Sequence, residues 1–293
     1  MALGRQSYHS AGPQPPEQPL RYPSAVTITS RQNPLVGRFR DAARGGSGAV
    51  LLLDGAHLVG EAVSAGVAVQ IAAVTPAAVE SGELQPLVTA LGEQGVEVAL
   101  VSAQVMDAIS PVRSSSAIVA LADRPANGQA QLYQGTAPMV VIAVDVQDPG
   151  NIGAIVRVAE AAGATGVVAA GASANPFGWK ALRGSMGSAL RLPLVAGVTP
   201  AAAIEDARSH GCRIVATVPR DGQALFDARL SGPVAILIGG EGPGLAAEVL
   251  AAADQRVTIP MQAPVESLNA AVTAAVLLYE ARRQQSAIAR KRP

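Results

Sequence analysis

The stretch VTIPMQAPVESLNAAVTAAVLLYE, residues 257–280, changes character twice within a short distance. It begins as an apolar run typical of a buried strand and ends in an Ala-, Val- and Leu-rich pattern that predicts a long helix. Between the two lie Glu266, Ser267 and Asn269, polar residues placed where the apolar face of the helix would start. Glu266 would favour the positive end of a helix dipole and Ser267 would serve as a cap, so each alone has a structural explanation.

The same half of the chain contains further apolar strand patterns separated by helical ones. These runs occupy residues 139–146, 166–171, 213–219 and 234–240. Continuous apolar strands are typical of a parallel sheet that helices cover on both faces. We therefore expect residues 139–293 to form an α/β domain with a mostly parallel sheet. Ligands of such sheets bind beyond the carboxyl ends of the strands, where residues 266–269 fall.

A smaller α/β unit precedes that domain. Its strands are expected at 49–55, 69–75, 96–101 and 116–122, and its helices at 56–66 and 84–95. We place the unit at residues 25–125 and a polar linker at 126–138. Residues 1–24 are rich in proline and polar side chains, too poor in apolar surface to fold, and are expected to be a disordered tail.

Composition restricts the class of protein. Hydrophobic residues make up 49% of the 293 positions but aromatic ones only 3%, so the cores must consist of Ala, Val, Leu and Ile. We find neither an apolar stretch long enough to span a membrane nor a secretory signal. Cys212 is the single cysteine, which excludes an internal disulfide and favours a reducing compartment, so we expect a cytoplasmic protein. The 22 basic and 22 acidic residues cancel, which counts mildly against a surface coated by nucleic acid.

Two more unusual loops follow strands of the predicted sheet. DVQDPGNIGAIVR (145–157) places Asn151 where a helix cap is wanted and Arg157 in a helix otherwise made of Ile, Val and Ala. LIGGEGPGL (237–245) surrounds Glu241 with glycines but matches neither a P-loop nor a dinucleotide fingerprint. A cap, a solvated arginine and a tight turn would explain the loops one by one. They do not explain why all three polar loops follow strands of one sheet.

Together the three loops resemble the signature motifs of the SpoU-type (TrmH) RNA ribose 2′-O-methyltransferases of the SPOUT superfamily. DPGNIGAIVR resembles the first motif, LIGGEGPGL the second, and TIPMQAPVESLNAAVTAAVLLYEARR the third, in the same order. FGWKALRGSMGSALRLPL (177–194) is similar to the segment between the first two. More loosely, ITSRQNPLVGRFRD and LLLDGAHLVGEAV resemble a substrate-binding domain with a ribosomal-protein fold, although Asp54-Gly55 stands where relatives often have Glu-Gly.

The resemblance implies a fold and a cofactor. Members of this family bind S-adenosylmethionine in a deep trefoil knot at the carboxyl end of the chain, a topology that is otherwise nearly absent from proteins. Residue by residue, it places the cofactor contacts at Gly239, Gly240, Ile259, Met261 and Leu268, chiefly through main-chain groups. No metal ion is expected, since His210 and Cys212 are too few for a zinc site.

The resemblance also implies methyl transfer to a ribose 2′-hydroxyl of RNA. The catalytic candidates are Arg157, Asn151, Glu241, Ser267 and Asn269. An arginine with a pKa above about 12 is an implausible free base, so we expect Arg157 to bind phosphate and orient the hydroxyl, with the base unassigned. Family members form homodimers through this domain, with the arginine acting across the interface.

RNA contacts and the identity of the RNA are less defined by the sequence. Arg31, Lys180 and Arg183 are candidate RNA-binding residues, with a solvated face as the alternative. The separate amino-terminal domain favours ribosomal over transfer RNA, in a housekeeping or an antibiotic-resistance role. A non-catalytic RNA-binding protein that retains the knot is a second hypothesis. A small-molecule α/β enzyme is a third, against which the missing P-loop and dinucleotide signatures count.

Overall fold

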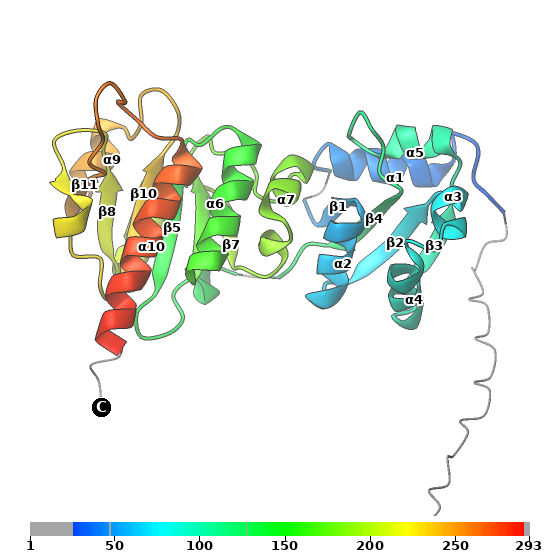
Figure 1. Ribbon diagram of the computed structural model, residues 1–293, viewed down its shortest axis with the longest axis horizontal. Helices are drawn as coiled ribbons and strands as arrows, with labels where there is room; N and C mark the ends of the chain where they lie inside the picture. Colours follow the sequence, from blue (N-terminus) through cyan, green and yellow to red (C-terminus); the bar gives the residue numbers. More distant parts are fainter. Residues whose placement is uncertain (1–25, 47, 127, 290–293) are drawn as a thin grey trace, which may run out of the picture.

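The computed structural model describes residues 26–46, 48–126 and 128–289, so the predicted tail at 1–24 lies outside the described residues. Two lobes stand side by side, each built around its own sheet (Figure 1). The amino-terminal lobe contains four strands and the carboxyl-terminal lobe contains seven. None of the described helices combines the length and apolarity needed to cross a membrane.

The amino-terminal lobe is a mixed sheet with helices around it. Its elements are α1 (Pro34–Ala43), β1 (Val50–Asp54), α2 (Ala56–Ser64), β2 (Val69–Val74), α3 (Pro76–Glu80), α4 (Gln85–Glu93), β3 (Glu97–Leu100), α5 (Ala103–Ile109) and β4 (Ile118–Asp123). The strand order is β1-β4-β2-β3, in which β4 runs antiparallel to both neighbours and β2 pairs parallel with β3. All four strands were predicted, but α1, α3 and α5 were not. Asn33 caps α1 and Ser102 caps α5, signals that sequence reading passed over.

The carboxyl-terminal lobe is the larger α/β unit. Its strands are β5 (Met139–Val144), β6 (Gly166–Ala170), β7 (Leu194–Val198), β8 (Arg213–Thr217), β9 (Gln223–Ala224), β10 (Val234–Gly239) and β11 (Gln255–Thr258). Its α-helices are α6 (Pro149–Ala162), α7 (Trp179–Ser185), α8 (Pro200–Ser209), α9 (Ala247–Ala251) and α10 (Ala270–Ala289). The strand order is β7-β6-β5-β10-β8-β11-β9, and each neighbouring pair is parallel. The predicted parallel sheet is confirmed.

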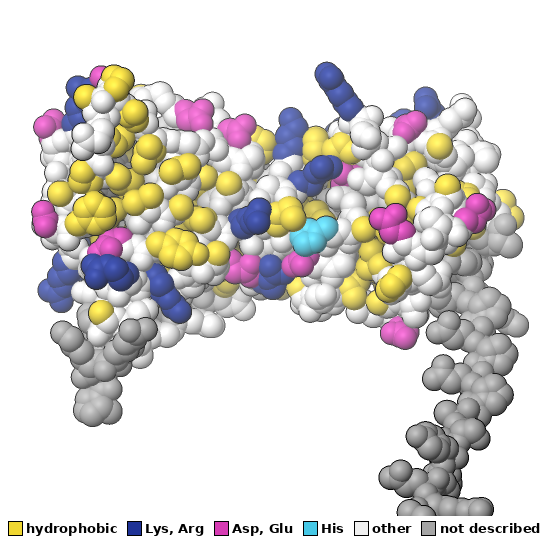
Figure 2. All heavy atoms as spheres, in the orientation of Figure 1, with side chains coloured by type: hydrophobic (Ala, Val, Ile, Leu, Met, Phe, Trp, Pro, Cys, Tyr) yellow, Lys and Arg dark blue, Asp and Glu magenta, His cyan; other side chains and the backbone are white. Residues whose placement is uncertain are grey.

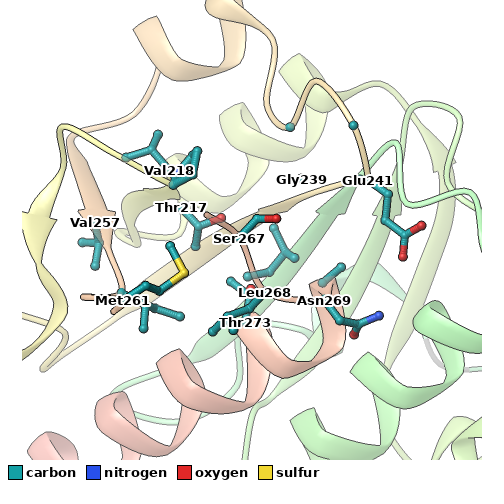
Figure 3. A pocket seen from close by; sticks show the side chains of 17 residues that line it. Thr217, Val218, Gly239, Glu241, Val257, Met261, Ser267, Leu268, Asn269 and Thr273 are labelled. Atoms are coloured by element: carbon teal, nitrogen blue, oxygen red, sulfur yellow. The ribbon is translucent and has the colours of Figure 1, made fainter. Parts of the chain in front are cut away.

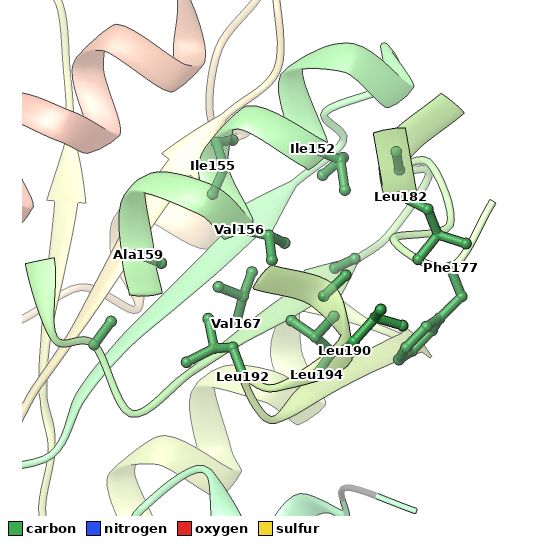
Figure 4. Packing of buried hydrophobic residues seen from close by; sticks show 14 of the residues in the cluster. Ile152, Ile155, Val156, Ala159, Val167, Phe177, Leu182, Leu190, Leu192 and Leu194 are labelled. Atoms are coloured by element: carbon green, nitrogen blue, oxygen red, sulfur yellow. The ribbon is translucent and has the colours of Figure 1, made fainter. Parts of the chain in front are cut away.

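Helices cover this sheet on both faces, which explains its continuous apolar strands. Along β5, Val141 and Ala143 join the core beneath α6 and α10, whereas Val140 and Ile142 face α8 and α9. Figure 4 shows the first of these cores, where the apolar face of α6 packs toward β6 and the segment around η2 (Ser188–Leu190). Because both faces are covered, the open side of the sheet lies at its strand ends.

Candidate active site

Three polar side chains, one from each unusual loop, form a hydrogen-bonded row at the carboxyl ends of the strands. Asn269 donates from Nδ2 to Asn151 Oδ1 at 2.9 Å, and Asn151 donates from Nδ2 to Glu241 Oε1 at 2.7 Å. The partners lie 118 and 90 residues apart in the sequence. The fold therefore brings together residues that follow β5, β10 and β11.

The start of α6 leaves Asn151 available for this row. Asp148, not Asn151, is the N-cap, since its Oδ1 accepts the backbone N–H of Asn151 at 2.8 Å. Pro149 occupies the first helical position, where a missing N–H costs nothing. The interpretation of Asn151 as a cap was wrong, because the helix begins two residues earlier. Its side-chain amide is consequently free to bridge Glu241 and Asn269.

Asn269 combines a structural and a site role. Its Oδ1 accepts the backbone N–H groups of Ala271 and Val272 at 2.9 and 3.3 Å, which satisfies two free donors at the start of α10. Its Nδ2 is turned to Asn151. The capping role considered for Ser267 thus belongs to Asn269.

A cavity of about 350 Å³ lies beside the row (Figure 3). All five predicted cofactor residues line it, as do Glu241, Ser267 and Asn269. These five cofactor residues are Gly239, Gly240, Ile259, Met261 and Leu268. In Figure 3, Glu241 and Asn269 lie at one end of the cavity, and Met261 and Val218 lie toward the other. The cavity thus has a polar end next to an apolar wall.

Part of the cavity wall was not predicted from the sequence. Thr217, Val218 and Pro219 reach the cavity from the end of β8, and Thr273 reaches it from the first turn of α10. Two signals were available in the sequence. Thr217, Val218 and Pro219 stand at the end of an apolar strand, and Thr273 stands four residues beyond Asn269. Thr217 donates its hydroxyl to the carbonyl of Leu237 at 2.9 Å, which ties this part of the wall to the sheet.

The glycines of the second loop are required by close backbone contacts. A Cβ atom on Gly240 would overlap the carbonyl oxygen of Asp145, and one on Gly239 would lie 2.8 Å from the carbonyl carbon of Gly244. Asp145 itself has a left-handed backbone, with a φ of 56°. The main chain after β10 therefore crosses directly over the end of β5, and it exposes backbone groups to the cavity.

Two of the predicted catalytic side chains have no partner within the described chain. Ser267 lines the cavity, and its hydroxyl makes no hydrogen bond there. Arg157 lies exposed on α6 and is not among the residues that line the cavity, and its guanidinium has no ion-pair partner in the described ranges. Glu266 does have one: its carboxylate accepts from Arg220 at 2.5 Å in an exposed pair, so it is not turned to the row.

The three predicted RNA-binding residues lie away from the cavity. Arg31 donates to the carbonyl of Gln104 at 3.1 Å, and the Lys180 ammonium lies 5.5 Å from the centre of the Trp179 ring. Arg183 forms an ion pair with Asp54 at 2.6 Å. Arg183 is thus at least partly a structural residue.

Comparison with known proteins identifies the family. A sequence model of the SpoU rRNA Methylase family matches residues 138–279, and a model of the thiostrepton-resistance methylase N terminus matches residues 25–135. An uncharacterised tRNA/rRNA methyltransferase of Synechocystis sp. is 34% identical over 267 residues, covering 89% of this chain and 94% of that protein. The chain belongs to the SpoU rRNA methylase family. The motif resemblance is therefore confirmed.

Further members of the SpoU rRNA methylase family share both sequence and fold with this chain. The 23S rRNA (guanosine(2553)-2′-O)-methyltransferase RlmP of Bacillus subtilis is 30% identical over 79% of this chain and 88% of its own. The AdoMet-bound rRNA methyltransferase of Sinorhizobium meliloti superposes with a TM-score of 0.77 at 26% identity, covering 88% of this chain and 97% of that one. The SpoU methyltransferase AviRb of Streptomyces viridochromogenes, in complex with AdoMet, gives 0.75 at 27% identity, with coverages of 86% and 98%.

Proposed function

We propose that this protein transfers a methyl group from S-adenosylmethionine to a ribose 2′-hydroxyl of ribosomal RNA. The observation that carries the proposal is the Asn269–Asn151–Glu241 row at the edge of the cavity. Relatives named as 23S rRNA 2′-O-methyltransferases and neighbours with AdoMet bound support the substrate and the cofactor. A transfer RNA substrate is the alternative, and an rRNA substrate implies a cytoplasmic location.

The residues of the cavity fit S-adenosylmethionine. A volume of about 350 Å³ is in the range of pockets that enclose a small ligand. Ile259, Met261 and Leu268 offer an apolar wall, and the glycines offer main-chain donors and acceptors. When bound, the cofactor supplies an electrophilic methyl group on a sulfonium.

The polar row would then orient the attacking hydroxyl. Displacement at a methyl group requires oxygen, carbon and sulfur in line, so a rigid positioning group contributes more than a flexible one. Asn151 is held from both sides, which fixes Glu241 and Asn269 relative to the cavity. Of the described residues that line the cavity, Glu241 alone has an ionisable side chain, which makes it the candidate to accept the hydroxyl proton.

We propose that Arg157 completes the site of a second copy of the chain. Its guanidinium points to no partner in its own described chain and does not reach its own cavity. The outer face of α10 carries Val272 and Tyr279, which are 47% and 53% exposed. Figure 2 shows apolar side chains gathered over the lobe that contains α10. An apolar face of this kind suits a homodimer in which Arg157 binds the RNA phosphate next to the partner's cavity.

We also propose that the carboxyl-terminal lobe contains a trefoil knot. Three features support it. Residues 259–269 lead from β11, near the sheet edge, back to α10, which packs beside α6 and β10. The turn after β10 passes against Asp145, and Gly240 forms a bridge with Gly244.

The amino-terminal lobe is proposed to bind the RNA. We assign residues 25–125 to this unit, 126–138 to the linker and 139–293 to the methyltransferase domain. Arg31 and Lys180 stay candidates for phosphate contacts, whereas the Arg183 guanidinium is paired with Asp54. Figure 2 supports the proposed RNA-binding role, since Lys and Arg side chains gather along the junction of the lobes.

The test is a labelling experiment with tritiated S-adenosylmethionine and total RNA from cells that lack the enzyme. We expect label in the large ribosomal RNA and recovery of 2′-O-methylated nucleosides by mass spectrometry. Label confined to transfer RNA would establish the alternative substrate. Absence of RNA labelling, together with no cofactor binding in calorimetry, would favour a non-catalytic RNA-binding protein.

A further inference from the structure

Helix α7 lies between the two lobes and packs against both (Figure 1). It contacts α6 of the carboxyl-terminal lobe and β1 of the amino-terminal lobe. Trp179, its first residue, packs against the core formed by α1, α5 and the amino-terminal sheet. Lobes of a chain usually move relative to each other unless their interface is large and apolar or otherwise fixed, so the contacts of α7 decide whether these lobes are rigid.

A buried carboxylate fixes α7 to the amino-terminal lobe. The side chain of Asp54, at the end of β1, is fully buried. One of its oxygens accepts from Ser110 Oγ at 2.9 Å, within the same lobe. The other accepts from Arg183 Nη1 at 2.6 Å, across the junction. Because a buried carboxylate is costly without its cation, this ion pair holds more firmly than an exposed one.

On its other side, α7 is in backbone contact with α6. A Cβ atom on Gly153 would lie 2.9 Å from Gly184 Cα and would overlap the carbonyl oxygen of Ala181. The two helices therefore touch without intervening side chains. Gly153 stands two residues beyond Asn151, whose side chain holds the catalytic row. Contacts thus run without a break from Asp54 to the edge of the cavity.

A second cluster of ion pairs joins the lobes at a different point from the Asp54–Arg183 pair, so the lobes cannot rotate about that pair. Arg191 binds Glu61 of α2 in the amino-terminal lobe and also Glu160 of α6, the latter at 2.7 and 2.9 Å. The Arg191 guanidinium holds the pKa of the Glu160 carboxyl below its usual range. Two separate crossings by Arg183 and Arg191 define an orientation, whereas one would define only a pivot.

We propose that the Asp54–Arg183 pair and α7 form a rigid link that sets the distance between the RNA held by the amino-terminal lobe and the methyl group in the cavity. The inference rests on the proposed function. Asp54 and Arg183 are positioning residues, since neither touches the cavity. A rigid link of fixed length makes the choice of nucleotide a matter of geometry: the amino-terminal lobe binds one feature of the RNA, and the ribose at a fixed distance from it is methylated.

The test compares RNA and cofactor binding with methyl transfer in matched variants of the full-length protein. Asp54→Asn/Arg183→Gln removes both charges and leaves no unpaired buried carboxylate, so it keeps the fold. We expect its kcat on ribosomal RNA to fall at least tenfold, while the Kd values for S-adenosylmethionine and for the RNA change less than threefold. Arg183→Lys, which keeps a cation, should recover part of the loss.

Arg208→Ala is the control, because Arg208 forms an ion pair with Asp254 at 3.1 Å that is exposed and lies wholly within the carboxyl-terminal lobe. It should leave kcat unchanged. Spin labels on cysteines placed at the exposed positions Glu93 and Glu205 report the distance between lobes. We expect a narrow distance distribution in the wild type and a broad one in the double variant, measured in dimers diluted with unlabelled chain.

Two results would overturn the inference while leaving the proposed function intact. In the first, the double variant methylates RNA at the wild-type rate. In the second, its kcat falls only in parallel with a loss of RNA affinity, which would make Arg183 a simple RNA contact. If the wild type itself labels no RNA, the proposed function fails. The distance measurement then still decides whether α7 holds the lobes together.

Discussion

Asn151 uses both ends of its side-chain amide, donating to Glu241 and accepting from Asn269. An amide is the natural choice at this point because it is a donor and an acceptor at once and carries no charge. The adjacent carboxylate needs a donor and Asn269 needs an acceptor. A substitution that changes only the donor or acceptor character of Asn151 therefore tests the hydrogen-bonded row.

Asn151→Asp should reverse the interaction with Glu241. Two carboxylates about 3 Å apart cannot both ionise readily, so one pKa of the pair should rise. We expect methyl transfer at pH 8 to fall by about a hundredfold, the scale for loss of one oriented hydrogen bond at a catalytic centre. Activity should partly return toward pH 6, because protonation of one carboxyl restores a donor.

The pH profile of kcat is the measurement, and Asn151→Ala is the control. The alanine variant cannot regain a donor, so its residual activity should show no recovery at low pH. An identical pH profile for both variants would contradict the row as the reason for the loss.

Gly240→Ala tests the close crossing of the chain over β5. The added methyl group would overlap the carbonyl oxygen of Asp145, a backbone atom that cannot turn aside as the end of a side chain could. We expect a loss of about 3 kcal/mol in the free energy of unfolding, measured by urea denaturation. Gly37→Ala in α1 is the matched control, since its Cβ would meet nothing within 4 Å and alanine favours a helix. Equal stabilities for the two variants would refute the crossing.

Among the elements, α6 joins the Asp148 cap to Asn151, for which we propose a role in methyl transfer. Asp148→Ala should cost about 1 kcal/mol of stability, the usual value of an N-cap. It should also lower kcat several-fold, because the helix turn that carries Asn151 would fray. Thr199→Ala separates the two effects: Thr199 caps α8 in the same lobe by accepting from the Ala202 N–H, and it is not among the residues that line the cavity. The stability of both variants is measured by thermal denaturation, and their activity as kcat. An equal loss of kcat in the two variants would refute the link between the Asp148 cap and methyl transfer.

The predictable elements were those whose pattern is local. The apolar runs of β5, β6, β8 and β10 were sufficient to predict a parallel sheet, because burial on both faces leaves few polar positions. The loops after β5, β10 and β11 were recognised from their glycines and polar residues. The wall formed by Thr217, Val218 and Pro219 was missed, since its local signal, a place at the end of an apolar strand, is shared with the other strands of the sheet.

The features that sequence reading missed depend on long-range pairs. Arg183 was interpreted as an RNA contact, but it binds a carboxylate 129 residues away. No local pattern indicates such a partner. Similarly, Asn151 was considered as a cap because it stands near the expected helix start. Asp148, three residues earlier, has a similar capping propensity, and only the backbone decides between the two. The bounds of the amino-terminal unit and the roles of the individual site residues stay predictions.

At the scale of the whole molecule, the proposed dimer makes each site depend on two chains. A mixture of Arg157→Ala and Asn151→Ala subunits should be more active than either variant alone. Random pairing makes half of the dimers mixed, and each mixed dimer has one complete site, so about a quarter of wild-type activity should return. Refolding the two variants together and measuring methyl incorporation provides the test. An inactive mixture would show that Arg157 acts within its own chain, and sedimentation would show whether the dimer exists.

The strand order of the large sheet has a consequence for how the protein is made. β10, near the end of the chain, lies between β5 and β8, so the middle of the sheet stays open until residues 234–239 have been synthesised. Non-local pairing of this kind slows folding. The amino-terminal sheet also receives its last strand, β4, between β1 and β2, but that sheet is complete at Asp123, before β5 begins. We therefore expect the amino-terminal lobe to fold first on the ribosome, while β5 and β8 each keep one edge exposed until β10 is made.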